Sequence, residues 1–183
     1  MRVRFSGLGG QGVVMAGVIY GHAAMLQGFD VLQRQSYGST TRGGVTTSDV
    51  TTEHGEIHEI ESPDFDVIVA LCQEAHDKYR PLLVPGGLLL TESTLVDISN
   101  IDNIRHIPVP AIEVARERLG RQILTNIVIL GALARHADAV GPESLRRAIS
   151  AHVPPGTERL NFDAFDLGWE AADHVTPVTP PTA

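Results

Sequence analysis

Hydrophobic and polar positions change along the chain in short blocks, and the period of each block predicts its secondary structure. Alternation with period two predicts strands, and a period near 3.6 predicts helices. Strands are predicted at residues 2–6, 29–35, 45–53, 56–60, 66–71, 88–91 and 104–107. Helices are predicted at residues 13–26, 74–79, 112–119, 121–136, 142–152 and 162–172. Strands that alternate with helices are typical of α/β proteins.

One pair of predicted strands indicates the kind of sheet. The β-branched run at residues 45–53 is followed by His54-Gly55 and by a second short strand at 56–60, which predicts a β-hairpin. A hairpin adds antiparallel pairs, whereas strands joined through helices pair in parallel. We therefore expect an α/β fold, a three-layer α/β/α Rossmann-like domain with a mixed, mostly parallel sheet.

Proline and glycine positions predict several boundaries. Pro85-Gly86-Gly87 should turn the chain into the strand at 88–91, and Pro108 should end the strand at 104–107. The chain from residue 176 onward is rich in Pro and Thr, which is typical of a loose tail. Because no repeat or linker divides the rest, residues 1–173 are predicted to form a single domain and residues 174–183 a flexible tail.

Composition and charge exclude several classes of protein. A formal net charge of −8 leaves no basic stripe for phosphate backbones, so we expect no nucleic-acid partner. The longest apolar stretch, residues 123–134, is shorter than the roughly 20 residues that span a bilayer, so we expect no membrane association. The first residues lack the apolar core and cleavage site of a signal peptide, which predicts a cytoplasmic location.

The cysteine and histidine content limits metal chemistry. Cys72 is the single cysteine, which excludes an internal disulfide and any iron-sulfur cluster or zinc site made from several thiolates of this chain. The histidines are scattered, and His54 and His58 are the two that lie close in sequence, on a predicted hairpin surface. We predict no metal site. Any electron transfer would require another subunit.

A glycine-rich turn, Gly7-Leu8-Gly9-Gly10-Gln11-Gly12, joins the first predicted strand to the first helix. It matches the G-x-G-x-x-G pattern, whose glycines permit a tight turn, approach of the backbone to a pyrophosphate and close packing of helix on strand. The acid that would hold a ribose hydroxyl is missing, because the next strand ends at Gln33-Arg34-Gln35 and Asp30 lies at its beginning. Close packing without a nucleotide is therefore the alternative reading of the turn.

The polar loop at residues 36–44 is long for a compact domain, which favours a function. Arg42, beside Gly43 and Gly44, could bind a carboxylate or phosphate, or could pair with an acid of its own chain. Tyr37 could offer its hydroxyl at an interface or pack beneath the loop. Neither side chain is predicted to be catalytic.

Two amides accompany the glycine-rich segments. Gln11 could reach a partner or a phosphate, or could cap its own helix. Asn126 lies in an apolar helix, where an unpaired amide would cost about 1 to 3 kcal/mol. It must therefore have partners, and we expect them in the Gly-rich loops, which would make Asn126 a structural pin.

Taken together, these segments resemble the gamma subunit of 2-oxoacid:ferredoxin oxidoreductases. The residues that carry the resemblance are Gly7 to Val14 with Ala16-Gly17, Ser36-Tyr37-Gly38, Arg42-Gly43-Gly44, Ser62-Pro63, Asn126, Leu130-Gly131-Ala132, Asn161-Phe162, Ala164-Phe165 and Gly168. They extend over almost the whole chain before the tail. The loop around Tyr37 and Arg42 is similar to the 2-oxoglutarate type. Many relatives have an acid between these two residues, where this chain has Ser39-Thr40-Thr41.

The resemblance implies an oxidoreductase complex in which this chain is a gamma subunit and is not active alone. Other subunits would bind thiamine diphosphate with magnesium, decarboxylate 2-oxoglutarate, pass electrons through [4Fe-4S] clusters to ferredoxin, and transfer the acyl group to coenzyme A as succinyl-CoA. This chain would bind no cofactor by itself. It would complete and brace the site, with alpha, beta and, where present, delta subunits as partners.

Two loops would form the cofactor-binding or interface region of the subunit. The residues concerned are Gly9, Gly10, Gln11, Gly12, Tyr37, Gly38, Arg42, Gly43 and Gly44. No catalytic residue is implied, and the isolated chain could pair with itself as a homodimer. The alternatives are a pyruvate or indolepyruvate:ferredoxin oxidoreductase subunit, or a stand-alone Rossmann-type nucleotide-binding protein.

Overall fold

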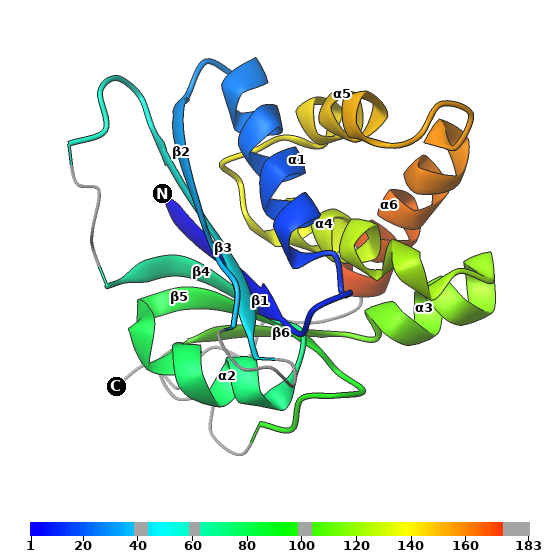
Figure 1. Ribbon diagram of the computed structural model, residues 1–183, viewed down its shortest axis with the longest axis horizontal. Helices are drawn as coiled ribbons and strands as arrows, with labels where there is room; N and C mark the ends of the chain where they lie inside the picture. Colours follow the sequence, from blue (N-terminus) through cyan, green and yellow to red (C-terminus); the bar gives the residue numbers. More distant parts are fainter. Residues whose placement is uncertain (39–43, 59–62, 99–103, 174–183) are drawn as a thin grey trace.

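The computed structural model describes residues 1–38, 44–58, 63–98 and 104–173, and a six-stranded sheet lies at its centre (Figure 1). The strand order is β2-β3-β1-β4-β5-β6. The strands are β1 (Arg2–Gly7), β2 (Asp30–Ser36), β3 (Thr46–Glu53), β4 (Phe65–Ala70), β5 (Leu83–Glu92) and β6 (Arg105–Val109). The helices are α1 (Val13–Leu26), α2 (Gln73–Tyr79), α3 (Ala111–Leu119), α4 (Thr125–His136), α5 (Pro142–His152) and α6 (Glu158–Asp173), with 3-10 turns η1 (Arg80–Leu82) and η2 (Gln122–Leu124).

The sheet is mixed and mostly parallel, which confirms the predicted fold class. Strands β1, β4, β5 and β6 pair in parallel, whereas β3 pairs antiparallel with both β1 and β2. The predicted hairpin between the strand at 45–53, which is β3, and a strand at 56–60 is wrong. Residues 56–58 form no strand, because both edges of β3 are already occupied by β1 and β2. The antiparallel hairpin is made by β2 and β3 instead.

Two predicted strand boundaries at proline are also wrong. Strand β5 begins at Leu83 and runs through Pro85-Gly86-Gly87, and a register irregularity opposite β4 takes up the turn. Strand β6 continues through Pro108 to Val109. β6 is the edge strand, where a residue without an N–H group is tolerated.

The two faces of the sheet are covered unequally (Figure 1). Helices α1, α3, α4, α5 and α6 lie on one face, and α2 lies on the other. The main core fills the space beneath the five helices, where the rings of Phe5 and Tyr20 meet edge to face at 5.8 Å. Smaller apolar clusters lie beneath α2, around Ala75 and Ile68. The chain therefore has one thick and one thin helical layer.

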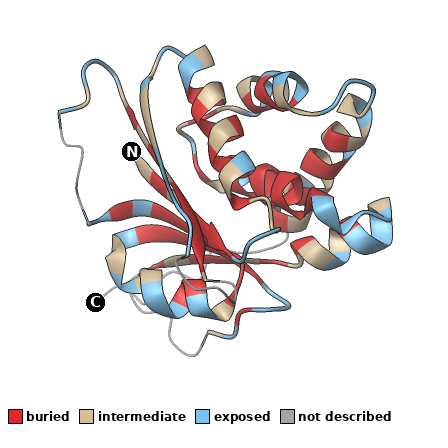
Figure 2. Ribbon diagram, viewed as in Figure 1, coloured by how far each residue is buried: buried red, intermediate tan, exposed pale blue. Residues whose placement is uncertain are grey.

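Helix α4 is the most deeply buried helix of the described chain, as its apolar sequence predicts (Figure 2). It packs against α6 through two glycines. A side chain at Gly131 would overlap the carbonyl oxygen of Phe165, and one at Gly168 would overlap that of Val128. The two helices therefore touch backbone to backbone.

The predicted tail at residues 174–183 lies outside the described residues. Among the residues that the structure does describe, no helix has the length and apolar character to cross a membrane.

Candidate functional site

The carboxyl edge of β1 and β4 brings the predicted site segments together. β1 continues into α1 and β2 on one side, and β4 lies on the other side, so this edge is the topological switch point where ligands of open α/β sheets bind. The strand register pairs Gly7 with Thr46, and Ser36 with Thr47. The glycine-rich turn and the end of the β2–β3 hairpin therefore emerge at the same edge.

The side chain of Gln11 organises the turn. Its Oε1 accepts a hydrogen bond of 2.6 Å from the backbone N–H of Leu8, and its Nε2 donates one of 2.9 Å to the carbonyl of Leu71 at the end of β4. The cap residue of α1 is Gly12. Gln11 therefore does not cap α1, and it ties the turn to the neighbouring strand.

At two positions of the turn, contacts within the chain require glycine. A Cβ at Gly7 would lie 2.5 Å from Oε1 of Gln11 and 3.0 Å from Cβ of Leu71. Gly12 has a φ of 72°, in the left-handed region, and a Cβ there would lie 2.7 Å from the amide of Asn126. The Nδ2 of Asn126 also lies 3.5 Å from the carbonyl oxygen of Gly12. Asn126 thus contacts the turn from α4.

Gly9 differs from these two glycines. It is exposed, its φ is not positive, and a Cβ on it would meet nothing within 4 Å. Gly10 is equally open but has a φ of 91°, which favours glycine. Neither packing nor backbone conformation within the described chain therefore requires glycine at position 9.

The end of the β2–β3 hairpin is a narrow neck. A Cβ on Gly38 would overlap the backbone of Gly44, so the two strands of the neck touch there. Tyr37 is 66% exposed and its hydroxyl donates to Oε1 of Gln35 at 2.9 Å, so the second of its two alternatives, packing beneath the loop, is wrong. Arg42 and Gly43 lie outside the described residues.

Apolar side chains surround the turn, and sequence patterning did not single them out. Leu8 is 39% exposed, Met15 on the first turn of α1 is 43% exposed, and Ile123 in η2 is 78% exposed. A hollow of about 310 Å³ lies between Gly10 and Ile123. Exposed apolar residues beside an open backbone are typical of protein interfaces.

The start of α1 offers hydrogen-bond donors but little acid-base chemistry. In the described chain, no side chain caps this helix and no acid lies in its first turn, so its N-terminal N–H groups keep a partial positive charge. Cys72 follows β4 nearby, but it is buried, and burial raises the pKa of its thiol. A thiol with a raised pKa is a poor nucleophile.

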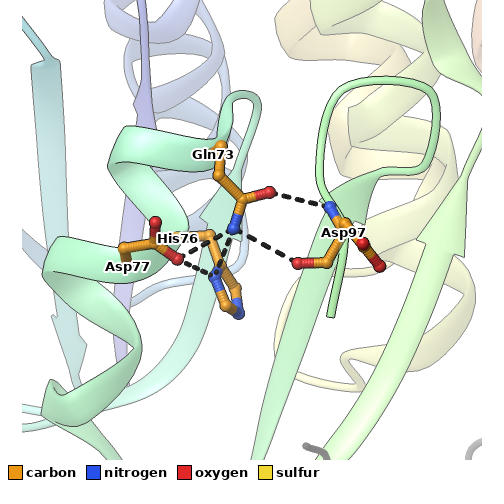
Figure 3. A network of polar contacts seen from close by, with 4 residues as sticks. All are labelled: Gln73, His76, Asp77 and Asp97. Carbon is orange, nitrogen blue, oxygen red and sulfur yellow. Dashed lines mark hydrogen bonds and ion pairs between the residues drawn. The ribbon is translucent and has the colours of Figure 1, made fainter. Parts of the chain in front are cut away.

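A polar network at the start of α2 was missed at the level of sequence (Figure 3). The amide of Gln73 exchanges two hydrogen bonds with the backbone of Asp97, at 2.8 and 3.2 Å. His76 lies 2.8 Å from Oδ1 of Asp77, and hydrogen bonds from His76 and then Gln73 lower the pKa of that carboxyl. The network joins α2 to the segment after β5, and nothing in the periodicity predicts such a long-range amide bridge.

Comparison with known proteins identifies the family. The family model described as pyruvate ferredoxin/flavodoxin oxidoreductase matches residues 2–171. The chain belongs to this family. The 2-oxoglutarate synthase subunit KorC of Methanocaldococcus jannaschii, a similar protein, is 39% identical over 173 residues, which cover 93% of this chain and 92% of the relative.

Solved structures agree with this membership of the pyruvate ferredoxin/flavodoxin oxidoreductase family. The gamma subunit of keto/oxoacid ferredoxin oxidoreductase from Geobacter sulfurreducens has a TM-score of 0.85 and 38% identity, covering 95% of this chain and 99% of that one. The 2-oxoglutarate:ferredoxin oxidoreductase of Magnetococcus marinus also has a TM-score of 0.85, at 21% identity, over 98% of this chain and 32% of that one. The second match supports the fold alone. The resemblance to a gamma subunit is confirmed.

Proposed function

We propose that this chain is the gamma subunit of a 2-oxoglutarate:ferredoxin oxidoreductase. The complex would oxidatively decarboxylate 2-oxoglutarate to succinyl-CoA and reduce ferredoxin in the cytoplasm. Support comes from the 2-oxoglutarate synthase relative, which matches this chain along nearly the whole length of both proteins. The missing ribose acid at the end of β2 argues against a stand-alone nucleotide-binding enzyme.

The cofactors would belong to the other subunits. Thiamine diphosphate, magnesium, [4Fe-4S] clusters and coenzyme A would be held by the alpha and beta subunits and, where present, a delta subunit. The sequence supports this division, because one cysteine cannot supply the four thiolates of a cluster. The gamma subunit would contribute shape and backbone hydrogen-bond donors, and no catalytic side chain.

The carboxyl edge of β1 and β4 would be the surface that meets the partner. The residues proposed for it are Gly9, Gly10, Gln11, Gly12, Tyr37, Gly38 and Gly44, together with Arg42 and Gly43. The single observation that carries the proposal is Gly9, because no described residue of its own chain and no positive φ requires glycine at this position. A partner that approaches the turn closely would exclude a side chain at this position. Leu8 and Ile123 would then be covered by that partner.

The test is Gly9→Val in the complex reconstituted with its other subunits, with Gly141→Val as the matched control. Gly141 has an extended backbone (φ −70°, ψ 154°), and a Cβ there would first meet Gln27 at 3.9 Å, so both glycines have room for a side chain. Gly9→Val should keep its stability within about 0.5 kcal/mol. Gly141 is the N-cap residue of α5, where valine is less favourable than glycine, so Gly141→Val should lose about 0.5 to 2 kcal/mol, which makes it the more stringent control. Gly9→Val should weaken assembly about tenfold or lower 2-oxoglutarate-dependent ferredoxin reduction, whereas Gly141→Val should do neither. Normal assembly and turnover with Gly9→Val would contradict the proposed surface.

A substrate comparison tests the rest of the proposal. Reduction of ferredoxin by the assembled complex should require coenzyme A and should be faster with 2-oxoglutarate than with pyruvate or indolepyruvate. A preference for either of the other acids would leave the subunit assignment in place and overturn the substrate.

A further inference from the structure

Two histidines meet in a hollow of about 450 Å³ that is lined by α1, β2 and α5. Figure 1 shows α5 beside α1. Nδ1 of His22 in α1 lies 3.0 Å from Nε2 of His152, the last residue of α5. The rings meet edge to face, with an interplanar angle of 88° and centroids 5.1 Å apart. Because 130 residues separate the two along the chain, no sequence spacing predicts the pair.

The helical repeat of α1 places His22 in the hollow. Val18, His22 and Met25 are spaced by four and three residues, so they lie on one face of the helix, and all three line the hollow. Tyr20 and Ala23 point into the core instead and are buried. His22 is half-buried, so solvent reaches its side chain. An ion from solution can therefore reach the ring.

The electrostatic surroundings of the pair suit a cation. His22 and His152 are the two titratable side chains among the described residues that line the hollow, so no lysine or arginine there repels a positive ion. His152 ends α5, and the C-terminus of a helix carries a partial negative charge. Burial, and then the charge of His22, lower the pKa of His152, which favours the neutral imidazole that binds metal ions. The net charge of the chain, −8, also attracts cations.

The distance between the two nitrogens fits two neighbouring ligands of one ion. With metal–nitrogen bonds of about 2.0 to 2.1 Å, two nitrogens bound at a right angle lie about 2.9 Å apart, and two bound at a tetrahedral angle lie about 3.3 to 3.4 Å apart. The observed 3.0 Å is close to the right angle, which is typical of Cu²⁺ and Ni²⁺. The χ2 torsion of histidine is broad, so the rings can turn both lone pairs towards one ion while the helices stay in place.

The proton of the hydrogen bond has another position available. In the bond between His22 and His152, one of the two nitrogens carries a proton, whereas a metal ion needs the lone pairs of both. A neutral imidazole can hold its single proton on either ring nitrogen. The proton therefore moves to the other nitrogen of the same ring, and metal binding to the neutral pair releases no net proton.

We propose that His22 and His152 form a surface site for one divalent transition metal ion, with Cu²⁺ bound most tightly. Affinity of nitrogen ligands rises to copper along the first-row metals. In the part of the chain that the structure describes, no group of three or more His, Cys, Asp and Glu side chains is arranged to hold a metal, so water would complete the coordination. The bound ion would join the end of α5 to the second half of α1. This proposal reverses the expectation of no metal site, which came from the scattered positions of the histidines along the chain.

The experiment titrates the full chain, freed of metals with a chelator, with Cu²⁺ in a calorimeter and compares two variants. His152→Gln keeps an amide that can hydrogen-bond to His22 but removes a ligand. Since loss of an outer-shell partner already costs about 10- to 100-fold in metal affinity, His152→Gln should weaken Cu²⁺ binding at least about 100-fold. His58→Ala removes an exposed histidine elsewhere and should change the affinity by less than about twofold. The electron spin echo of the bound Cu²⁺ should show modulation from two imidazoles in the unchanged chain and from fewer in His152→Gln.

Thermal unfolding gives an independent measurement. Free Cu²⁺ at about a hundred times its Kd should raise the melting temperature of the unchanged chain by roughly 5 to 10 °C, and the rise should be absent in His152→Gln. If His152→Gln melts lower than the unchanged chain in the presence of chelator, His22→Asn supplies the comparison. Equal Cu²⁺ affinities of the unchanged chain and both variants, or a signal from a single imidazole, would overturn the site and leave the pair as a hydrogen bond alone. Tighter binding of Zn²⁺ than of Ni²⁺ would overturn the right-angle geometry.

Discussion

Replacing Gly131 with alanine tests whether the backbone contact between α4 and α6 holds the helical layer together. A Cβ at this position would overlap the carbonyl oxygen of Phe165 and would lie 3.0 Å from the backbone nitrogen of Trp169. Both obstacles are backbone atoms of α6, so no side chain can rotate to make room. The helices must move apart, and part of the main core must move with them.

The size of the effect follows from two opposing terms. Overpacking of a dense core costs about 1 to 3 kcal/mol, and a clash with backbone on the facing helix belongs at the upper end. Alanine is a better helix former than glycine by about 1 kcal/mol. The net loss of stability should be about 2 kcal/mol, which for a domain of this size lowers the melting temperature by roughly 4 to 8 °C.

Urea unfolding followed by tryptophan fluorescence measures this directly, because Trp169 is the single tryptophan and lies in α6 at the contact. The matched control is Gly9→Ala, where the new methyl group would meet no described residue within 4 Å and the free energy of unfolding should change by less than about 0.5 kcal/mol. A loss below that size for Gly131→Ala, or equal losses for the two variants, would refute the tight contact between α4 and α6.

Two further predictions concern charged groups. Asp49→Asn should lower the free energy of unfolding by about 1 to 3 kcal/mol, because the largely buried guanidinium of Arg4 loses its carboxylate partner. As a control, Glu117→Gln in the exposed pair with Arg116 should lower it by less than about 0.5 kcal/mol. Equal urea midpoints for the two variants would contradict this prediction. Burial, and then the charge of His76, lower the pKa of His106 to about 4. In the unfolded chain this histidine has a pKa near 6.5, so below that pH protonation favours the unfolded state. The contribution of His106 to the free energy of unfolding should therefore be fully present above about pH 6.5 and should fall by up to about 3 kcal/mol between pH 6.5 and pH 4. His106→Asn should flatten this loss in urea titrations at several pH values, and an unchanged slope would contradict the assignment.

Much of the fold could be predicted from sequence because most elements have a clear period and clear ends. Residues 13–26 were predicted as a helix and form α1, and the end of α3 at Gly120 follows from its left-handed conformation. Errors occurred where tertiary pairing decides. Which strands pair with β3 depends on which sheet edge is vacant, and β6 tolerates Pro108 because it is the edge strand. A local sequence pattern shows neither the order of the strands nor the position of the sheet edge.

The candidate site likewise has features that a local sequence pattern predicts and features that depend on tertiary contacts. The glycine-rich turn and the loop containing Tyr37 were recognised, because glycine spacing and loop length are local properties. The exposure of Ile123, the bridge from Gln11 to Leu71 and the pair of Arg4 with Asp49 were not. The two contacts join segments far apart in the sequence, and the exposure of Ile123 depends on how η2 packs, so none of the three has a local sign in the sequence.

The position of β3 explains why the G-x-G-x-x-G turn of this chain lacks the acid that accompanies it in a dinucleotide-binding fold. In a dinucleotide-binding fold the second strand lies next to the first, so its terminal acid stands beside the turn. Here β3 is inserted between β1 and β2, and the end of β2 lies two strand spacings, about 10 Å, from the end of β1. An acid at that end would be too far from a ribose at the turn, and the chain has none there. What remains is the geometry that glycine confers: Gly7 and Gly12 are required by contacts within the chain, whereas a Cβ on Gly9 would meet no described residue within 4 Å, so the backbone there is open.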